Sequence, residues 1–130
     1  MRKNGNSTRR QAARETGRRL LLHLGPGLRQ AIDPGDIYFV EAAGDDTRVR
    51  TRASRTIRDV RPMGEIARVL VGQGFVRTHR NCLVNPAHVR EVRRRPDGDD
   101  WELKLDPPVN LVLPVSRSAL RALWAAFGEE

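Results

Sequence analysis

Cysteine, aromatic residues and long apolar runs are all scarce in this sequence of 130 residues. The single cysteine, Cys82, excludes an internal disulfide and is typical of the reducing cytoplasm, where we expect the protein to reside. Aromatic residues make up 5% of the chain, so a core must consist mainly of Val, Leu and Ile. No apolar run approaches the roughly 18 residues of a membrane-spanning helix, and the basic N-terminus lacks the apolar segment of a signal peptide. These absences predict one domain without a membrane anchor.

Positive charge is abundant. The chain has 24 basic and 16 acidic residues, a formal net charge of +8, and 22 of the basic residues are arginine. The guanidinium presents a planar fork of donors that matches phosphates and the edge of guanine. The excess therefore indicates a polyanionic partner such as a nucleic acid. Arginine in place of lysine is also what a genome rich in G and C encodes, and composition alone leaves both interpretations open.

The charge is concentrated at one end. Residues 1–19 hold seven basic residues and one acidic residue, a net charge of +6, so the rest of the chain carries +2. Residues 1–18 contain almost no large apolar side chains, which predicts a disordered basic tail ahead of a folded domain at 19–128. Such a tail would serve as a non-specific DNA arm or as an inert linker, and the sequence does not decide between them.

The folded part consists mostly of short segments with strand character, separated by turn residues such as Gly25-Pro26-Gly27 and Gly44-Asp45-Asp46. We expect strands at 19–24, 28–32, 37–42, 47–53, 54–61, 75–78, 81–84, 89–93, 101–105 and 110–115. In the segment 47–53, three arginines alternate and therefore share one face: Arg48, Arg50 and Arg52. This row is either a solvated sheet face or a DNA contact.

Two segments have helical spacing. Met63, Ile66, Ala67 and Leu70 form an apolar stripe that begins with Pro62 in the first turn and ends at Gly72 and Gly74. Near the C-terminus, Ser116 is placed to cap a helix that ends at Gly128, with one apolar face made of Leu120, Leu123, Trp124 and Phe127. The sequence thus predicts a mainly β fold with one short internal helix and one C-terminal helix.

No set of residues indicates catalysis. The three histidines lack the spacing of metal ligands, one cysteine cannot complete a zinc site, and no glycine-rich phosphate loop is present. Cys82 and His79 are three residues apart, and on one extended segment they would point to opposite faces. The acidic residues at 45–46 and 97–100 fall in turns, where Asp serves backbone geometry. We therefore predict that the protein is not an enzyme and uses no cofactor or metal.

The segment 77–86 is unusually dense in polar side chains. Arg77, His79, Arg80 and Asn81 lie within five positions, just ahead of an apolar strand. Buried charge is costly, so this segment suits a loop that reaches phosphates and base edges. Structural roles are also expected here. Asn85 precedes a proline and is placed to cap a turn, and His79 could hydrogen-bond to a buried backbone carbonyl.

A second polar point follows the last predicted strand. If Ser116 caps the helix, Arg117 lies in its first turn, at the positive end of the helix dipole. A cation is disfavoured there unless an anion lies beside it. A phosphate or the edge of a guanine would supply the missing acceptor.

Three segments together resemble the LytTR DNA-binding family. They are Ile37-Tyr38-Phe39-Val40-Glu41-Ala42, Phe75-Val76-Arg77-Thr78-His79-Arg80-Asn81-Cys82-Leu83-Val84-Asn85 and Leu113-Pro114-Val115-Ser116-Arg117. The resemblance covers roughly residues 20–127. It implies an elongated stack of small antiparallel sheets whose loops enter successive major grooves of promoter direct repeats. The implied partner is double-stranded DNA, and a homodimer on tandem sites is left open. Family members often carry a receiver domain ahead of this module, for which the chain has no room.

The resemblance also implies site residues. Arg80 and Arg117 are the expected base contacts, because arginine binds guanine in a bidentate manner. The remaining candidates for base or phosphate contacts are Thr47, Arg48, Arg77, His79, Asn81 and Ser116. The acidic pair Asp45 and Asp46 departs from what a phosphate-contacting loop prefers.

Two other classes of function remain open. An RNA-binding module would need exposed aromatics for base stacking, and Tyr38, Phe39, Phe75 and Trp101 alternate as core residues do. A protein-interaction domain would sequester a related regulator, and it would bind DNA only weakly.

Overall fold

The computed structural model describes residues 19–53 and 55–129; the basic tail predicted at 1–18 lies outside the described residues. The strands are β1 (Leu20–Gly25), β2 (Leu28–Ile32), β3 (Ile37–Ala43), β4 (Asp46–Thr51), β5 (Thr56–Asp59), β6 (Val76–His79), β7 (Cys82–Val84), β8 (Val89–Arg94), β9 (Trp101–Leu105) and β10 (Val112–Val115). The helices are α2 (Met63–Val71) and α3 (Leu120–Ala126), with 3-10 turns η1 (Pro34–Asp36), η2 (Pro86–His88) and η3 (Arg117–Ala119).

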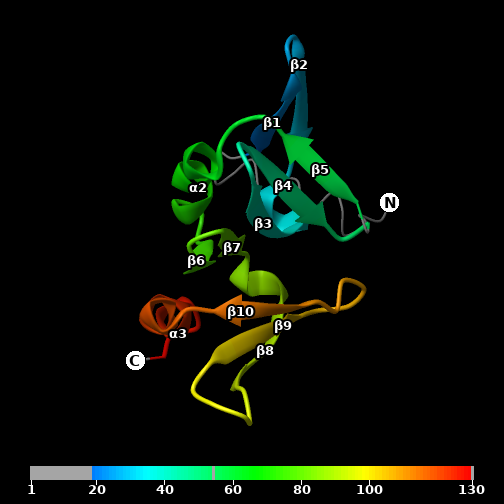
Figure 1. Cartoon of the computed structure of the whole chain (residues 1–130). Coiled ribbons are helices and arrows are strands. Elements are labelled where there is room, and N and C mark those ends of the chain that lie inside the picture. Colours follow the sequence, from blue (N-terminus) through cyan, green and yellow to red (C-terminus); the bar gives the residue numbers. More distant parts are fainter. Residues whose placement is uncertain (1–18, 54, 130) are drawn as a thin grey trace, which may run out of the picture.

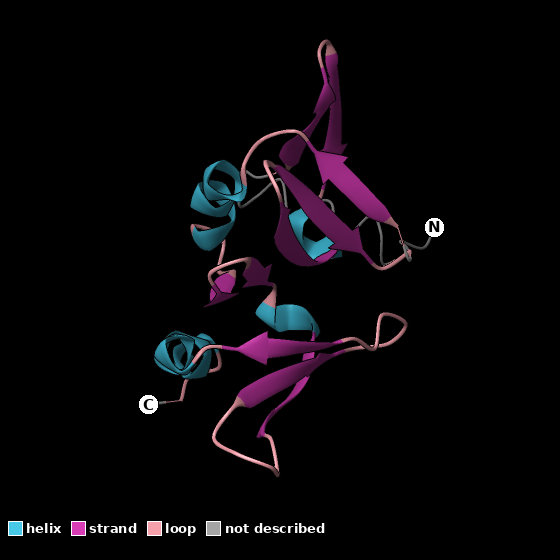
Figure 2. Cartoon of the chain, viewed as in Figure 1, coloured by secondary structure: helices cyan, strands magenta, loops and turns pink. Residues whose placement is uncertain are grey.

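All strand pairs are antiparallel, and they form three sheets. The orders are β1-β2, β5-β4-β3-β7-β6 and β10-β9-β8. The sheets follow one another along the long axis of the molecule, and α2 and α3 lie on the same side of the stack (Figures 1 and 2). The predicted fold class is therefore confirmed: a mainly β, elongated stack with one internal and one C-terminal helix.

The alternation predicted for β4 is present. Thr47, Val49 and Thr51 are buried, while Arg48 and Arg50 on the other face are exposed and half-buried. The β3–β4 hairpin closes through a two-residue turn at 44–45, where Gly44 has a φ of +64°. A positive φ is strained for residues that carry a Cβ, which explains the glycine at this position.

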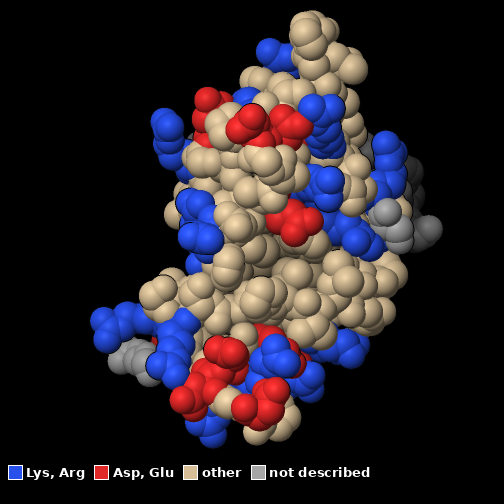
Figure 3. All heavy atoms as spheres, viewed as in Figure 1, with Lys and Arg blue, Asp and Glu red and all other residues tan. Residues whose placement is uncertain are grey.

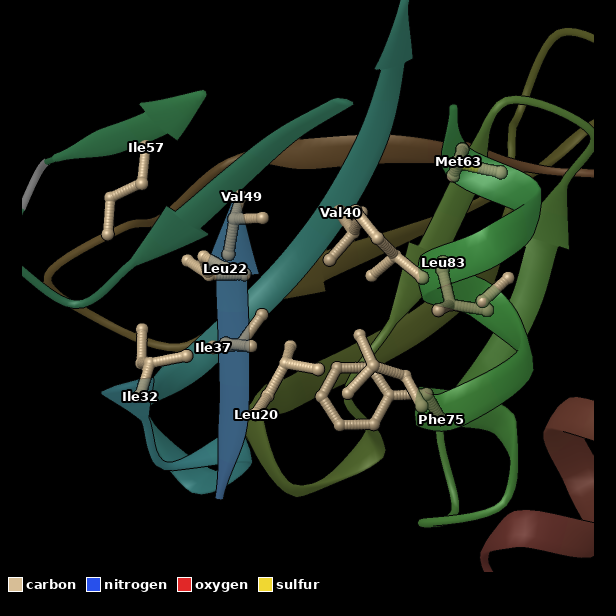
Figure 4. Close-up of a cluster of buried hydrophobic side chains, with 13 residues drawn as sticks. Leu20, Leu22, Ile32, Ile37, Val40, Val49, Ile57, Met63, Phe75 and Leu83 are labelled. Atoms are coloured by element: carbon tan, nitrogen blue, oxygen red, sulfur yellow. The ribbon is translucent and has the colours of Figure 1, made fainter. Parts of the chain in front are cut away.

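Two apolar cores stabilise the stack. The first lies between the β1–β2 hairpin, one face of the five-stranded sheet and α2, where side chains such as Leu22, Val40 and Val49 converge (Figure 4). As predicted, α2 contributes its buried stripe of Met63, Ile66, Ala67 and Leu70. Its N-cap is Pro62, so the helix begins one residue later than expected.

The second core joins the other face of the five-stranded sheet to the three-stranded sheet and α3. Its members include Phe39, Val84, Leu103, Val115 and Leu123. Burial of apolar surface stabilises a contact by roughly 25 cal/mol per Å². Because this core contains side chains of both sheets, it fixes the position of the three-stranded sheet relative to the five-stranded one. It therefore also sets where the loops of the two sheets meet.

The C-terminal helix differs from the prediction in two ways. Ser116 precedes η3, and its side chain makes no capping hydrogen bond. In α3, Leu123 is fully buried, but Phe127 is 48% exposed because the helix ends at Ala126 and the chain turns away at Gly128, whose φ is +77°. The expected cap and the last member of the apolar face were therefore wrong.

Asn85 has the structural role that the sequence suggested. Its side chain is buried, Oδ1 accepts a hydrogen bond from the Ala87 amide at 3.0 Å, and Nδ2 donates to Ile37 O at 3.0 Å and to Pro34 O at 3.3 Å. The residue thus caps η2 and ties it to the chain around η1. Buried polar atoms need such partners.

Candidate nucleic-acid interface

Strand register places two turns side by side at one edge of the five-stranded sheet. β3 and β7 pair with Glu41 opposite Cys82, so the β3–β4 turn at 44–45 and the β6–β7 turn at 80–81 project from the same edge. The Ala42 amide donates to Asn81 O at 2.9 Å and joins the two directly. The first and second sequence motifs therefore meet here.

The third motif reaches the same edge from the other sheet. The Ser116 amide donates to Thr78 O at 2.7 Å, which anchors the start of η3 beside the end of β6. β10 pairs with β9 so that Val115 lies opposite Trp101, and the β8–β9 loop at 95–100 emerges at this end too. We call these four segments, residues 44–46, 80–81, 95–100 and 116–117, the loop edge.

Arg80 and Asn81 form the tip of the β6–β7 turn, and both are exposed. Arg77 Nη2 donates to Arg80 O at 2.6 Å, and the Asn81 amide donates to His79 Nδ1 at 3.3 Å. Arg77 and His79 thus hold the turn, and His79 binds this amide instead of the buried carbonyl expected for it. Among the described residues, the guanidinium of Arg80 has no hydrogen-bonding or ionic partner, which leaves its donors free.

Arg117 opens η3 on the neighbouring segment. Its side chain is 69% exposed, and Nη2 lies 3.1 Å from Oδ2 of Asp99 in the β8–β9 loop. The anion that the sequence required beside Arg117 is therefore supplied within the chain. Asp99 was assigned only a turn role from the sequence, because nothing local indicates that the two loops meet.

Thr47 does not lie where a DNA contact requires it. Its side chain is fully buried, and Oγ1 donates to Arg61 O at 2.7 Å. This position follows from the alternation of β4, which turns Thr47 toward the first core and Arg48 toward solvent. Arg48 is exposed and lies between Glu41 and Arg58 in the sheet register.

A hollow of about 630 Å³ separates the two halves of the loop edge. It is lined on one side by Arg95, Asp100 and Trp101 and on the other by His79, Ser116 and Arg117. Its walls carry both charge signs. Figure 3 shows the same mixture over the three-stranded sheet, where acidic and basic side chains are interspersed.

Cys82 lacks the reactive thiolate that a catalytic nucleophile needs. β6 and β7 form a hairpin, so His79 and Cys82 pair across neighbouring strands and do not lie on one extended segment as assumed. Burial raises the pKa of the Cys82 thiol to about 11, which keeps it protonated near neutrality. Within residues 19–53 and 55–129, no group of three or more His, Cys, Asp or Glu side chains is arranged to hold a metal ion.

The four aromatic side chains that the sequence placed in strands are unsuited to base stacking. Tyr38, Phe39 and Phe75 are at most 5% exposed, and Trp101 is half-buried against Trp124 in an edge-to-face contact with ring centroids 5.5 Å apart. Stacking on a β face needs exposed rings. The RNA-binding alternative therefore lacks exposed aromatic rings on the described strands.

Comparison with known proteins agrees with this geometry. The family described as LytTr DNA-binding domain matches residues 30–128, and the chain belongs to this family. The CO-responsive transcriptional regulator RcoM of Rhodospirillum rubrum is 29% identical over 92 residues, which are 71% of this chain and 38% of RcoM. The chain thus spans under two-fifths of the length of this relative.

A solved structure shares the fold. It is the LytTr DNA-binding domain of a Bacillus cereus protein described as a methyl-accepting/DNA response regulator. The TM-score is 0.67 at 19% sequence identity, and the match covers 86% of this chain and 99% of that one. Within the part of the chain that the structure describes, no helix is long and apolar enough to span a membrane.

Proposed function

We propose that this chain regulates transcription by sequence-specific binding to double-stranded DNA, with the loop edge inserted into successive major grooves of promoter direct repeats. One observation supports this most directly. Two exposed arginines, Arg80 and Arg117, lie on adjacent segments that the Ser116–Thr78 hydrogen bond joins. The role in transcription is inferred from the regulator that the chain resembles over part of its length.

Each arginine suits base readout. Arg80 has free donors at the tip of a two-residue turn, and Arg117 is held only by an exposed carboxylate. A guanidinium that approaches guanine can donate to O6 and N7 together, and such a pair is worth about 1–3 kcal/mol of discrimination. We assign both side chains to bases.

The remaining candidates fit phosphate or positioning roles. Arg48 and Asn81 are exposed on the flanks of Arg80, where the backbone of a duplex would pass. Arg77 and His79 orient the β6–β7 turn through their hydrogen bonds, and Ser116 anchors η3 through its amide. Thr47 is excluded because it is buried.

Selection from a random DNA library tests the proposal. The full chain is incubated with random duplexes at about 150 mM salt, and bound DNA is amplified and sequenced over several rounds. We expect enrichment of a motif present as a direct repeat, with two copies of the protein on tandem sites. In a gel mobility-shift assay with the selected duplex, a homodimer on DNA would then be visible as a second shifted band.

The matched variants are Arg117→Ala and Arg29→Ala. Arg29 is exposed on the β1–β2 hairpin, which lies at the opposite end of the stack from the three-stranded sheet that Arg117 follows (Figure 1). On the selected duplex, Arg117→Ala should cost about 1–3 kcal/mol, and Arg29→Ala should cost far less. If no motif is enriched and binding only fades with salt, the domain is a general polyanion binder and the proposal is wrong.

A further inference from the structure

We propose that Asp99 competes with DNA for Arg117, so that the β8–β9 loop lowers the affinity of the domain for its own target. The inference rests on the proposed function and adds a regulatory contact to the same site. Asp99 thereby has a regulatory role and contacts neither a base nor a phosphate.

The contact joins two loops that are distant in sequence. Oδ2 of Asp99 lies 3.1 Å from Nη2 of Arg117, within the range of a charge-assisted hydrogen bond. The side chains are 74% and 69% exposed, so the pair faces the solvent that a duplex would displace. Arg117 has no other ionic or hydrogen-bonded partner among residues 19–53 and 55–129.

The pair is not needed to build the loop. The β8–β9 loop closes through its own backbone, with the Arg95 amide donating to Asp100 O at 2.7 Å and the Gly98 amide to Arg95 O at 3.4 Å. The loop leads directly into Trp101, the first residue of β9, and Trp101 pairs with Arg94 of β8. Removal of the Asp99 charge therefore leaves the scaffold intact.

The loop is also acidic as a whole. Asp97, Asp99 and Asp100 occupy four consecutive positions with Gly98, and the nearest basic residue of the loop, Arg95, lies 3.6 Å from Asp97. Asp100 also lines the hollow that Arg117 and His79 line. Phosphates approaching Arg117 meet negative charge, which raises the cost of binding for every duplex.

Competition has a defined consequence. A bidentate contact with guanine uses two donors of one guanidinium edge, and Nη2 is already engaged with Asp99. Because an exposed ion pair contributes little, removal of the carboxylate should tighten binding by about two- to fivefold. Most of that gain should depend on Arg117.

A double-mutant cycle on the full chain tests this. Wild type, Asp99→Asn, Arg117→Ala and the double variant are titrated against the duplex obtained by selection, at about 50 and 150 mM salt. Asp97→Asn is the matched control, since Asp97 is 75% exposed in the same loop and contacts Arg95 instead of Arg117. Melting temperatures verify that each variant is folded.

We expect Asp99→Asn to tighten binding by about two- to fivefold, with a gain in the Arg117→Ala background no larger than that of Asp97→Asn and a smaller effect at higher salt. Asp97→Asn should give the same small change in both backgrounds. An equal gain from Asp99→Asn in both backgrounds would overturn the inference and leave only general repulsion. Weaker binding by Asp99→Asn would also overturn it, since Asp99 would then orient Arg117 on the DNA.

The failures of the two proposals are distinguishable. If Arg117→Ala weakens binding but shows no coupling to Asp99, only the competition is wrong. If Arg117→Ala binds as wild type does, the assignment of Arg117 to a base fails as well.

Discussion

Arg61 holds both carboxylate oxygens of Asp59: Nε donates to Oδ1 at 3.0 Å and Nη2 to Oδ2 at 2.8 Å. Oδ2 also accepts from the His23 amide at 2.8 Å, and Arg61 Nη2 donates to Leu21 O at 3.0 Å. Asp59 is fully buried, whereas Arg61 is 19% exposed. The pair therefore joins the β1–β2 hairpin to β5, the edge strand of the five-stranded sheet.

Asp59→Asn should destabilise the domain by about 1.5–3 kcal/mol, because it removes a charged acceptor from several hydrogen bonds. Urea denaturation of the variant and of wild type measures the difference. Asp97→Asn, a change of the same kind on an exposed loop, is the control and should alter the free energy of unfolding by less than about 0.5 kcal/mol. Equal stability of both variants would contradict the role assigned to Asp59.

Stability should fall in acid because of the same group. Burial alone would raise the pKa of Asp59, but the hydrogen bonds from Arg61 and from the His23 amide outweigh it and hold the pKa below its ordinary value of 3.8. The unfolded chain therefore binds the proton first as pH falls, so the stabilisation is present above that value and is lost below it. Unfolding free energies between about pH 6 and pH 3 should decline more steeply for wild type than for Asp59→Asn. Parallel curves would contradict this account.

Sequence patterns predicted most of the secondary structure because alternation and turn chemistry are local. The segments 28–32 and 101–105 match β2 and β9. The contacts of Asp59 and Arg61 with the first hairpin were not predicted, since His23 and Leu21 lie 36 and 40 residues away in the sequence. The hydrogen bond from the hydroxyl of Thr47 to Arg61 O was not predicted either, because it joins two separate segments of the chain.

Asn85→Ala should be costly for a reason distinct from charge. The substitution leaves the buried carbonyls of Pro34 and Ile37 and the Ala87 amide without their side-chain partner. Unsatisfied buried groups cost about 1–3 kcal/mol, and we expect a loss in that range by thermal or urea denaturation. Asn85→Asp keeps the acceptor for Ala87 but buries a charge, so it should be no more stable than Asn85→Ala. A more stable Asn85→Asp would contradict the bonding described.

Cys82 should be unreactive in the folded protein. Its pKa of about 11 leaves little thiolate at pH 8, and the side chain is only 7% exposed. Alkylation by iodoacetamide at pH 8 should therefore be about a hundredfold slower than for a free cysteine, and it should accelerate on unfolding in urea. Rapid labelling of the native protein would show an accessible thiolate and reopen a chemical role.

The candidate site was only partly predictable. The order of the three motifs made Arg80 and Arg117 candidates for base contacts, which stay predictions. The Ser116–Thr78 hydrogen bond explains how their segments, nearly forty residues apart, become neighbours. Asp99 was missed because an Asp next to Gly98 has a sufficient local explanation as a turn residue. Its contact with Arg117 arises only once β9 and β10 pair and bring the two loops to one end of their sheet.

The most direct test of the central claim is the affinity of wild type and Arg80→Ala for the selected duplex and for a scrambled duplex of the same composition. At about 150 mM salt, fluorescence anisotropy should show wild type preferring the selected duplex by at least about a thousandfold. Arg80→Ala should lose about 1–3 kcal/mol on the selected duplex and far less on the scrambled one. Equal affinity of wild type for both duplexes, or an equal loss on both, would contradict base readout by the loop edge.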